Sequence, residues 1–252
     1  MAERINGGDG RTAIVRLAGV HKYFGGGASG VHALGDICLT VEAGEMVAIC
    51  GASGSGKTTL LNLVGMLETP TDGNVIVDSL LVSKLSEHGR AALRTELIGY
   101  VFQEFSLIPV MTARENVLLP LLLRQRLDRA QLQAAHARAD ELLTLLGLGG
   151  QVGEYPTRLD ASARQRVAIA RALLPRPRLV LADEPLTRQD SGCQRMILDV
   201  WAREQREAGT AFLITTRDQR QLSRVTRTLQ LSEGRLVRSA ADGARMPVRV
   251  QL

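Results

Sequence analysis

A run of glycine, serine, lysine and threonine residues has the spacing of a phosphate-binding loop. The segment Gly51-Ala-Ser-Gly-Ser-Gly-Lys-Thr58 matches the pattern G-x-x-x-x-G-K-[ST] in full. The apolar run Met46–Cys50 precedes it, and Thr59–Val64 follows with the residue types of a helix. Because a strand before the loop and a helix after it are the context in which such loops bind phosphate, we favour this interpretation over a chance glycine-rich turn.

The residue types within the loop indicate its chemistry. Glycines let successive backbone N–H groups turn toward phosphate oxygens, and the positive end of the following helix dipole adds to the attraction. We expect Lys57 to reach the β- and γ-phosphates of a nucleotide and the Thr58 hydroxyl to ligate Mg²⁺. The loop residues predicted to bind the nucleotide are Gly51, Ser53, Gly54, Ser55, Gly56, Lys57, Thr58 and Thr59.

Two acidic residues, Asp183 and Glu184, end the apolar run Leu179–Ala182 in the second half of the chain. An aspartate at a buried strand end can hold Mg²⁺, and the adjacent glutamate can polarise a water molecule that attacks the γ-phosphate. A strand that simply stops at polar residues is the alternative, which the phosphate loop upstream disfavours. Together the two segments predict binding of ATP or GTP with Mg²⁺.

Composition excludes several classes of protein. Of the 252 residues, 45% are hydrophobic and 23% are charged, which is typical of a folded globular chain and not of a disordered, collagen-like or disulfide-stapled one. The aliphatic runs are far shorter than the ~20 residues that span a bilayer. The polar start and the three cysteines, which lack metal-ligand spacing, favour a cytosolic protein without a secretory signal.

The net charge of +5 comes almost entirely from arginine. The arginines are scattered and aromatic residues make up only 3% of the chain, whereas single-strand nucleic-acid binders interleave basic and stacking residues. We therefore interpret the charge as a solvated surface, with a membrane-facing side as an option, and expect no nucleic acid as a partner.

The distribution of elements predicts an α/β core that carries a helical lobe. Between 112 and 148, Ala, Leu, Arg and Glu recur at helical spacing. A flexible start is expected at 1–12, one domain at 13–238 and a tail at 239–252. Short strands are predicted at 13–17, 37–41, 46–50, 74–78, 179–182, 211–215 and 228–231.

Several further segments resemble the ATP-binding subunits of ABC transporters. Tyr23 lies where that family stacks an aromatic ring on adenine, and Tyr100-Val-Phe-Gln103 resembles the Q-loop. Gln165–Leu173 is similar to the helix behind the family's signature, and Asp190 falls at the D-loop aspartate. The resemblance implies that Gln103 senses the γ-phosphate and joins Thr58 and Asp183 in binding Mg²⁺.

The likeness runs from about Ile14 to Val237 and carries a fold with it. It implies a P-loop NTPase core, with a mixed sheet flanked by helices and an antiparallel β portion. It also implies an ABC-specific helical subdomain at about 104–175. ATP and Mg²⁺ are the implied cofactors.

Two segments, 102–109 and 112–117, narrow the resemblance to the subunits that serve lipoprotein release, macrolide efflux and cell-division signalling. The implied partners are a permease of the four-helix type with a large external domain and a second ATP-binding subunit, identical or different. The implied location is peripheral, on the cytoplasmic face of the inner or plasma membrane. An ABC importer subgroup is the alternative.

The segment at the family's signature departs from Leu-Ser-Gly-Gly-Gln and reads Leu159, Asp160, Ala161, Ser162 and Ala163. In the family this segment binds the γ-phosphate of ATP held by the opposite subunit. An aspartate there repels the phosphate by about 4 kcal/mol at ~4 Å and an effective dielectric constant near 20, before neighbouring cations offset it. The simpler interpretation is that Asp160 caps the next helix, and both can hold.

Arg217 stands where the family has its switch histidine. An arginine can donate to the γ-phosphate, but it places protons differently, so its effect would be to hold ATP rather than turn it over. In a homodimer both sites carry both changes, and with an intact partner each site still carries one. We therefore predict ATP binding with slow or absent hydrolysis, with Glu184 as the general base.

Three functions follow from these observations. The first is the ATP-binding subunit of a membrane complex, in which ATP closes two subunits and moves the permease. The second is a regulatory or structural subunit that binds nucleotide without cycling, which Asp160 and Arg217 favour and Glu184 disfavours. The third is a nucleic-acid ATPase of the same family, which the lack of a long coiled coil or a second ATPase domain disfavours.

Overall fold

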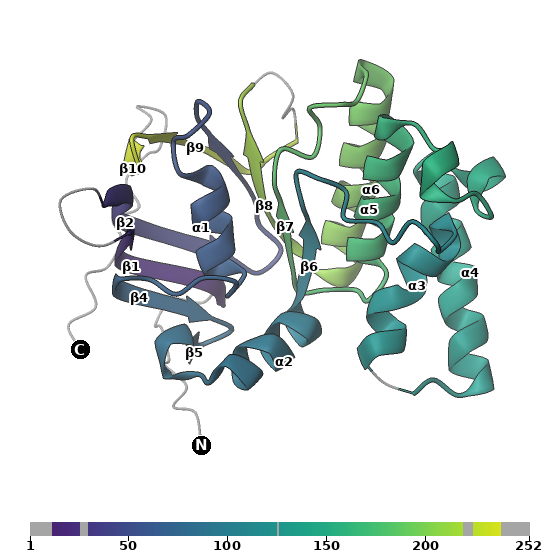
Figure 1. Ribbon diagram of the computed structural model, residues 1–252, viewed down its shortest axis with the longest axis horizontal. Helices are drawn as coiled ribbons and strands as arrows, with labels where there is room; N and C mark the ends of the chain where they lie inside the picture. The colour runs from purple at the N-terminus through teal and green to yellow at the C-terminus, as the bar shows by residue number, and fades with distance from the viewer. Residues whose placement is uncertain (1–11, 26–29, 125, 219–223, 238–252) are drawn as a thin grey trace.

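The computed structural model describes residues 12–25, 30–124, 126–218 and 224–237. They form two β-sheets and six α-helices (Figure 1). The expected flexible start, apart from Thr12, and the expected tail at 239–252 lie outside them. None of the described helices has the length and hydropathy to cross a bilayer.

The larger sheet has six strands in the order β10-β9-β3-β8-β7-β6. The five strands β9, β3, β8, β7 and β6 are parallel to their neighbours, and β10 is antiparallel to β9. Because β3, β7 and β8 are buried along their full length, they read as continuous apolar runs. The strands are β3 Met46–Cys50, β6 Ile98–Val101, β7 Leu179–Ala182, β8 Ala211–Thr216, β9 Arg227–Ser232 and β10 Arg235–Val237.

The smaller sheet is antiparallel, with the order β2-β1-β4-β5, and it confirms the expected antiparallel portion of a mixed α/β fold. Its strands are β1 Ala13–Phe24, β2 Val31–Glu42, β4 Asp72–Val77 and β5 Leu80–Leu81. Several register shifts interrupt the pairing of β1 with β2, so these two strands bend along their length.

The six helices divide between the two faces of the larger sheet (Figure 1). The region predicted to be helical, from 112 to 148, contains α3 and α4, and Asp128 begins α4 with a capping box formed with Gln131. Helices α3, α4 and α5 pack on one another inside the range expected for the helical subdomain. The helices are α1 Lys57–Val64, α2 Glu87–Leu97, α3 Ala113–Arg124, α4 Arg129–Leu145, α5 Ala161–Leu173 and α6 Ser191–Ala208.

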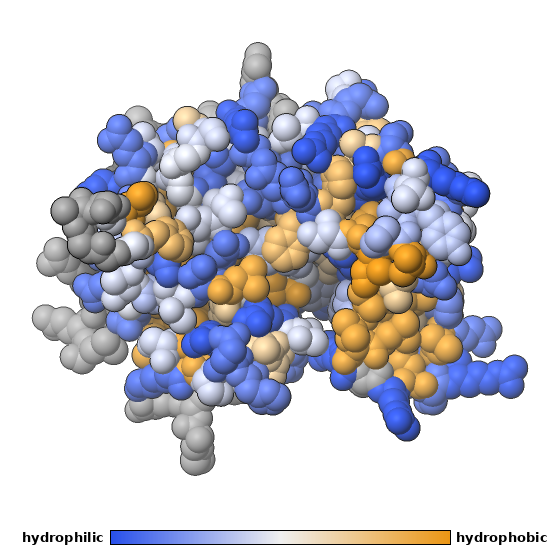
Figure 2. Space-filling model, in the orientation of Figure 1, coloured by the Kyte–Doolittle hydropathy of each residue, from blue (hydrophilic) through white to orange (hydrophobic). Residues whose placement is uncertain are grey.

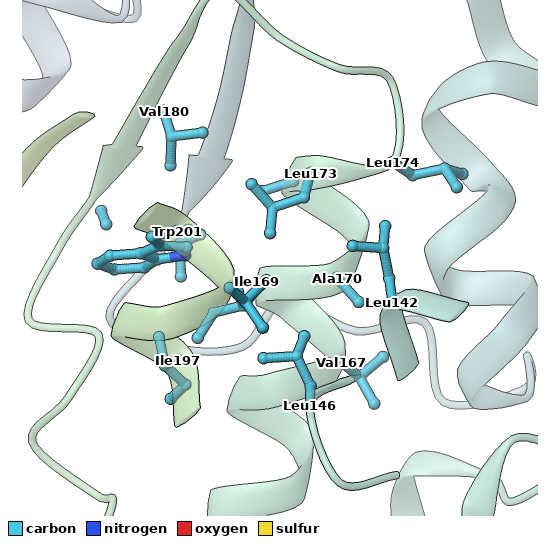
Figure 3. Close-up of a cluster of buried hydrophobic side chains, with 14 of the residues drawn as sticks. Leu142, Leu146, Val167, Ile169, Ala170, Leu173, Leu174, Val180, Ile197 and Trp201 are labelled. Carbon is cyan, nitrogen blue, oxygen red and sulfur yellow. The ribbon is translucent and has the colours of Figure 1, made fainter. Parts of the chain in front are cut away.

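Two hydrophobic clusters form the core, one on each face of the larger sheet. Alternate residues of β3 point to opposite faces, so Ala48 joins one cluster and Ile49 the other. The first cluster brings α4, α5 and α6 together through residues such as Leu142, Ile169 and Trp201 (Figure 3). The second lies between the larger sheet, α1 and the antiparallel sheet.

Candidate nucleotide-binding site

The phosphate loop joins the end of β3 to the start of α1 and needs glycine at two positions. A Cβ atom at Gly51 would lie 2.4 Å from the Leu231 carbonyl oxygen. Gly56 caps the helix with φ +101°, a conformation that L side chains rarely adopt. Gly54 also has positive φ, but a Cβ there would meet nothing within 4 Å. The loop is thus tight where it meets the sheet and open at its tip, as a phosphate cradle requires.

Lys57 and Ser55 supply polar groups inside this loop. The Lys57 side chain is buried, and its Nζ donates to the carbonyl oxygens of Gly51 at 2.9 Å and Ala52 at 2.8 Å. The Ser55 hydroxyl is buried and has no hydrogen-bond partner among the described residues. A buried ammonium group and an unpaired hydroxyl in a glycine-rich loop fit a phosphate group. Ser53 and Thr58 are exposed, and Thr59 is half-buried.

The two acidic residues lie directly beside the loop, as the sequence predicts. The Thr58 hydroxyl donates to Asp183 Oδ2 at 2.7 Å, although the two residues are 125 positions apart. Thr58 follows β3 and Asp183 follows β7, and their strands end at the same edge of the sheet. The structure therefore brings the predicted metal-binding hydroxyl and carboxylate together.

Thr215, at the end of β8, organises both acids and was not predicted from the sequence. Its hydroxyl donates to Asp183 Oδ1 and accepts the backbone N–H of Glu184 at 3.0 Å. Glu184 has φ +46°, which is strained for a residue with a side chain, and the hydrogen bond from its N–H helps to hold this conformation. The available signal was the pair of threonines, Thr215 and Thr216, that ends the otherwise apolar run of β8.

Arg217, which follows β8, contacts Glu184. Its Nε donates to Glu184 Oε1 at 2.8 Å, and Lys57 Nζ lies 3.6 Å from the same oxygen. The Glu184 side chain is 5% exposed, whereas that of Arg217 is 51% exposed. Two cationic groups thus converge on one oxygen of the predicted general base. The expected contact of Arg217 with a γ-phosphate stays a prediction.

Tyr100, on β6, lies within range of the Asp183 charge. Burial, with a smaller contribution from the Asp183 charge, raises the pKa of Tyr100, so its hydroxyl stays protonated. That hydroxyl donates to Asn62 Oδ1 at 2.9 Å and ties β6 to α1. Gln103 lies just beyond β6 and is exposed; in the described chain no hydrogen bond holds its side chain. It follows a strand that ends at the same edge of the sheet as the acids, and among the described residues no hydrogen bond joins it to them.

Tyr23, predicted to stack on adenine, lies on β1 and is 46% exposed. Its ring stacks on His32 of β2, with the ring centroids 4.3 Å apart and the planes 9° from parallel. The pair presents an aromatic surface beside solvent. His32 was not singled out from the sequence, because only the pairing of β1 with β2 brings it to Tyr23.

The altered signature begins α5, and the structure confirms Asp160 as its N-cap. The Asp160 carboxylate accepts the backbone N–H of Ala163 at 2.7 Å, while Leu159 is buried and Ala161 is half-buried. An aspartate at this position is therefore explained by its stabilising effect on α5, without any role in binding. It leaves the carboxylate on the exposed side of the helix terminus.

A second pair of hydrogen bonds joins the signature to the D-loop. The Ser162 hydroxyl donates to Gln189 Oε1 at 2.7 Å, and Gln189 Nε2 donates to the Ser162 carbonyl oxygen at 3.2 Å. The next residue, Asp190, caps α6, and the hydrogen bond from the Cys193 backbone N–H lowers the pKa of Asp190. Gln189 was not predicted as a site residue.

The donor set near Thr58 fits Mg²⁺ bound together with a nucleotide. Magnesium prefers oxygen ligands and is commonly held by one or two carboxylates plus substrate phosphates, which matches Thr58 and Asp183. In the part of the chain that the structure describes, no group of three His, Cys, Asp or Glu residues could bind a metal ion without such phosphates. The residues of the site would therefore bind Mg²⁺ together with the phosphates of a nucleotide.

Comparisons with known proteins agree with this geometry. The family model described as ABC transporter matches residues 34–187. The lipoprotein-releasing system ATP-binding protein LolD of Bordetella avium (strain 197N) is 43% identical over 225 residues, which are 89% of this chain and 96% of that protein. The macrolide export ATP-binding/permease protein MacB of Rhodopirellula baltica is 39% identical over 221 residues, which are 88% of this chain and 32% of that protein.

A solved structure shares the fold. It is the ATP-binding cassette MJ0796 in a dimeric post-hydrolysis state bound to ADP and phosphate, with a TM-score of 0.83 and 36% identity. The match covers 89% of this chain and 97% of that one. The chain therefore belongs to the ABC transporter family, in which it is an ATP-binding subunit.

Proposed function

We propose that this subunit binds ATP with Mg²⁺, pairs with a second ATP-binding subunit and transmits the resulting closure to a permease. The observation that carries this proposal is the contact between the Thr58 hydroxyl and the Asp183 carboxylate beside the buried Lys57 ammonium. The hydroxyl and the carboxylate are suited to bind Mg²⁺, and the ammonium group is suited to bind the phosphate oxygens of a nucleotide. The aromatic ring of Tyr23 would face the adenine.

Each residue has a distinct part in this mechanism. The N–H groups of the loop and Lys57 bind the β- and γ-phosphates and stabilise charge on them. Thr58 and Asp183 would hold Mg²⁺, with Gln103 as a third ligand, and the metal would neutralise charge on the phosphate oxygens. Glu184 takes a proton from water as the water oxygen attacks the γ-phosphorus. The bond to the bridging oxygen breaks, and ADP leaves with the electron pair.

Two relatives and one exposed surface of this chain support a permease as the partner. LolD is named as part of a lipoprotein-releasing system, and the MacB name joins ATP-binding and permease functions in one chain. On this chain, Leu122 and Leu123 of α3 are exposed, and Figure 2 shows a hydrophobic patch over that helix. We expect the patch to contact a permease of the four-helix type with a large external domain, on the cytoplasmic face of the membrane.

Hydrolysis at this site is proposed to be slow. Asp160 places a negative charge where the family uses a serine, and Arg217 pairs with the general base instead of standing free. The same contact of Arg217 favours a second candidate function, a regulatory subunit that binds nucleotide without cycling.

Phosphate release from the chain assembled with its permease tests both functions. We expect turnover well below the roughly 1–100 s⁻¹ typical of phosphoryl transfer, and its loss in Glu184→Gln. A fluorescent ATP analogue should still bind Glu184→Gln and should fail to bind Lys57→Ala. If Glu184→Gln leaves turnover unchanged, the chemistry belongs to another subunit and the regulatory function is correct.

A further inference from the structure

The surroundings of Glu184 leave neither of its carboxylate oxygens free for water. Oε1 accepts the Nε–H of Arg217 at 2.8 Å and faces Lys57 at 3.6 Å. Oε2 is buried and has no hydrogen-bond partner among the described residues. A general base must lie within hydrogen-bond reach of the proton that it takes. In this arrangement one oxygen is occupied by a cation and the other is enclosed.

The backbone of Glu184 is fixed as well. Its N–H donates to the Thr215 hydroxyl, and its φ of +46° leaves little freedom to reorient the side chain through the backbone. Thr215 lies at the end of β8, and Arg217 directly follows that strand. One short segment therefore fixes the backbone of the base through one residue and its carboxylate through the other.

The two cations near Oε1 are not equivalent. Lys57 also donates to two carbonyl oxygens of the phosphate loop and is 5% exposed, so its position is set by the loop. The Arg217 side chain is 51% exposed and can therefore rotate into solvent, whereas the Glu184 carboxylate that it pairs with is 5% exposed. Arg217 can thus leave Glu184 for solvent while Lys57 stays, but its departure removes the hydrogen bond of a buried carboxylate, and this cost is what restrains the base.

We propose that Arg217 is a positioning residue that restrains the general base and must swing away before Glu184 can activate water. The inference rests on the proposed ATPase function of the same site. A guanidinium group is permanently charged and has no acceptor, so it can neither take the proton from water nor pass it on. Its pairing with Oε1 therefore keeps basal turnover low, and any partner that draws Arg217 toward solvent accelerates hydrolysis.

Substitution of Arg217 by neutral glutamine tests the restraint. In the complex with the permease, Arg217→Gln should raise kcat by about tenfold and change the affinity for ATP by less than about twofold. Arg217→Lys keeps the charge and should restore low turnover. Arg224→Gln is the matched control, because the Arg224 side chain has the same 51% exposure and forms an ion pair of 2.6 Å with Asp199 instead of Glu184. The kcat of Arg224→Gln should equal that of the wild type.

The outcomes separate this inference from the proposed function. An unchanged or lower kcat in Arg217→Gln, with turnover still abolished by Glu184→Gln, overturns the restraint and leaves the ATPase function standing. A tenfold loss of ATP affinity in Arg217→Gln also overturns it, since Arg217 would then bind phosphate. The gain must vanish in the double variant with Glu184→Gln; turnover that persists there overturns the ATPase function itself.

Discussion

At the scale of single residues, the hydroxyl of Thr215 shows how much the site depends on groups outside its motifs. Ala182 pairs with Ile214 in the parallel register of β7 and β8, so the next residues, Asp183 and Thr215, come side by side. The phosphate loop and the two acids are local patterns that the sequence reveals directly. Thr215 and the contact of Arg217 with Glu184 depend on register between strands, which no local pattern contains.

Thr215→Val tests the role of that hydroxyl, because valine keeps the shape and β-branching of threonine. The substitution leaves the Glu184 N–H without its partner and removes a donor from Asp183, so the free energy of unfolding should fall by about 1–3 kcal/mol. Denaturation in guanidinium chloride measures this. Thr228→Val, at a half-buried position on β9, should stay within about 0.5 kcal/mol of wild type. Equal stability of both variants would contradict the bridging role.

At the scale of elements, the buried parallel strands were the most predictable part of the fold. The predicted bounds of β3 and β7 match the structure, because their apolar runs end where burial ends. β1 and β2 each extend over 12 residues, well beyond the predicted runs, since antiparallel pairing with register shifts continues past the core. β6 was not predicted, because it has only four residues and one of them is glycine.

That glycine, Gly99, explains how β6 packs on α5. A Cβ atom at Gly99 would lie 2.3 Å from the Ala172 carbonyl oxygen, which is backbone and cannot easily move. Gly99→Ala should therefore lower the free energy of unfolding by about 1–3 kcal/mol, measured by chemical denaturation. Gly150→Ala is the control, because a Cβ there meets nothing within 4 Å. If Gly99→Ala is as stable as the control, β6 and α5 are free to separate.

At the scale of the whole molecule, hydrogen bonds join two segments that would lie at the interface of the proposed dimer. The hydrogen bonds between Ser162 and Gln189 connect the start of α5 to the loop before α6. Arg164 and Arg188 each lie over the Phe105 ring, 5.1 and 5.0 Å from its centroid, and so connect the segment after β6 to the same two segments. These contacts hold the start of α5, the loop before α6 and the segment after β6 together.

The exposed carboxylate of Asp160, at the start of α5, should weaken the proposed dimer. Asp160→Asn keeps a good helix cap and removes the charge, so stability should stay unchanged while repulsion of the partner's ATP disappears. In a Glu184→Gln background with Mg-ATP, sedimentation analysis should show the association constant of the dimer raised by at least about tenfold. A tenfold change corresponds to about 1.4 kcal/mol, well within the repulsion of about 4 kcal/mol that the carboxylate would exert at ~4 Å.

Asp128→Asn provides the matched control for this experiment. Asp128 caps α4 through the same kind of hydrogen bond, from the Gln131 backbone N–H at 2.8 Å, and carries the same charge. Its substitution changes net charge equally, so it should leave dimerisation unchanged if repulsion is local to Asp160. Equal gains in both variants would assign the effect to the overall charge of the molecule, and no gain in either would remove Asp160 from the dimer interface.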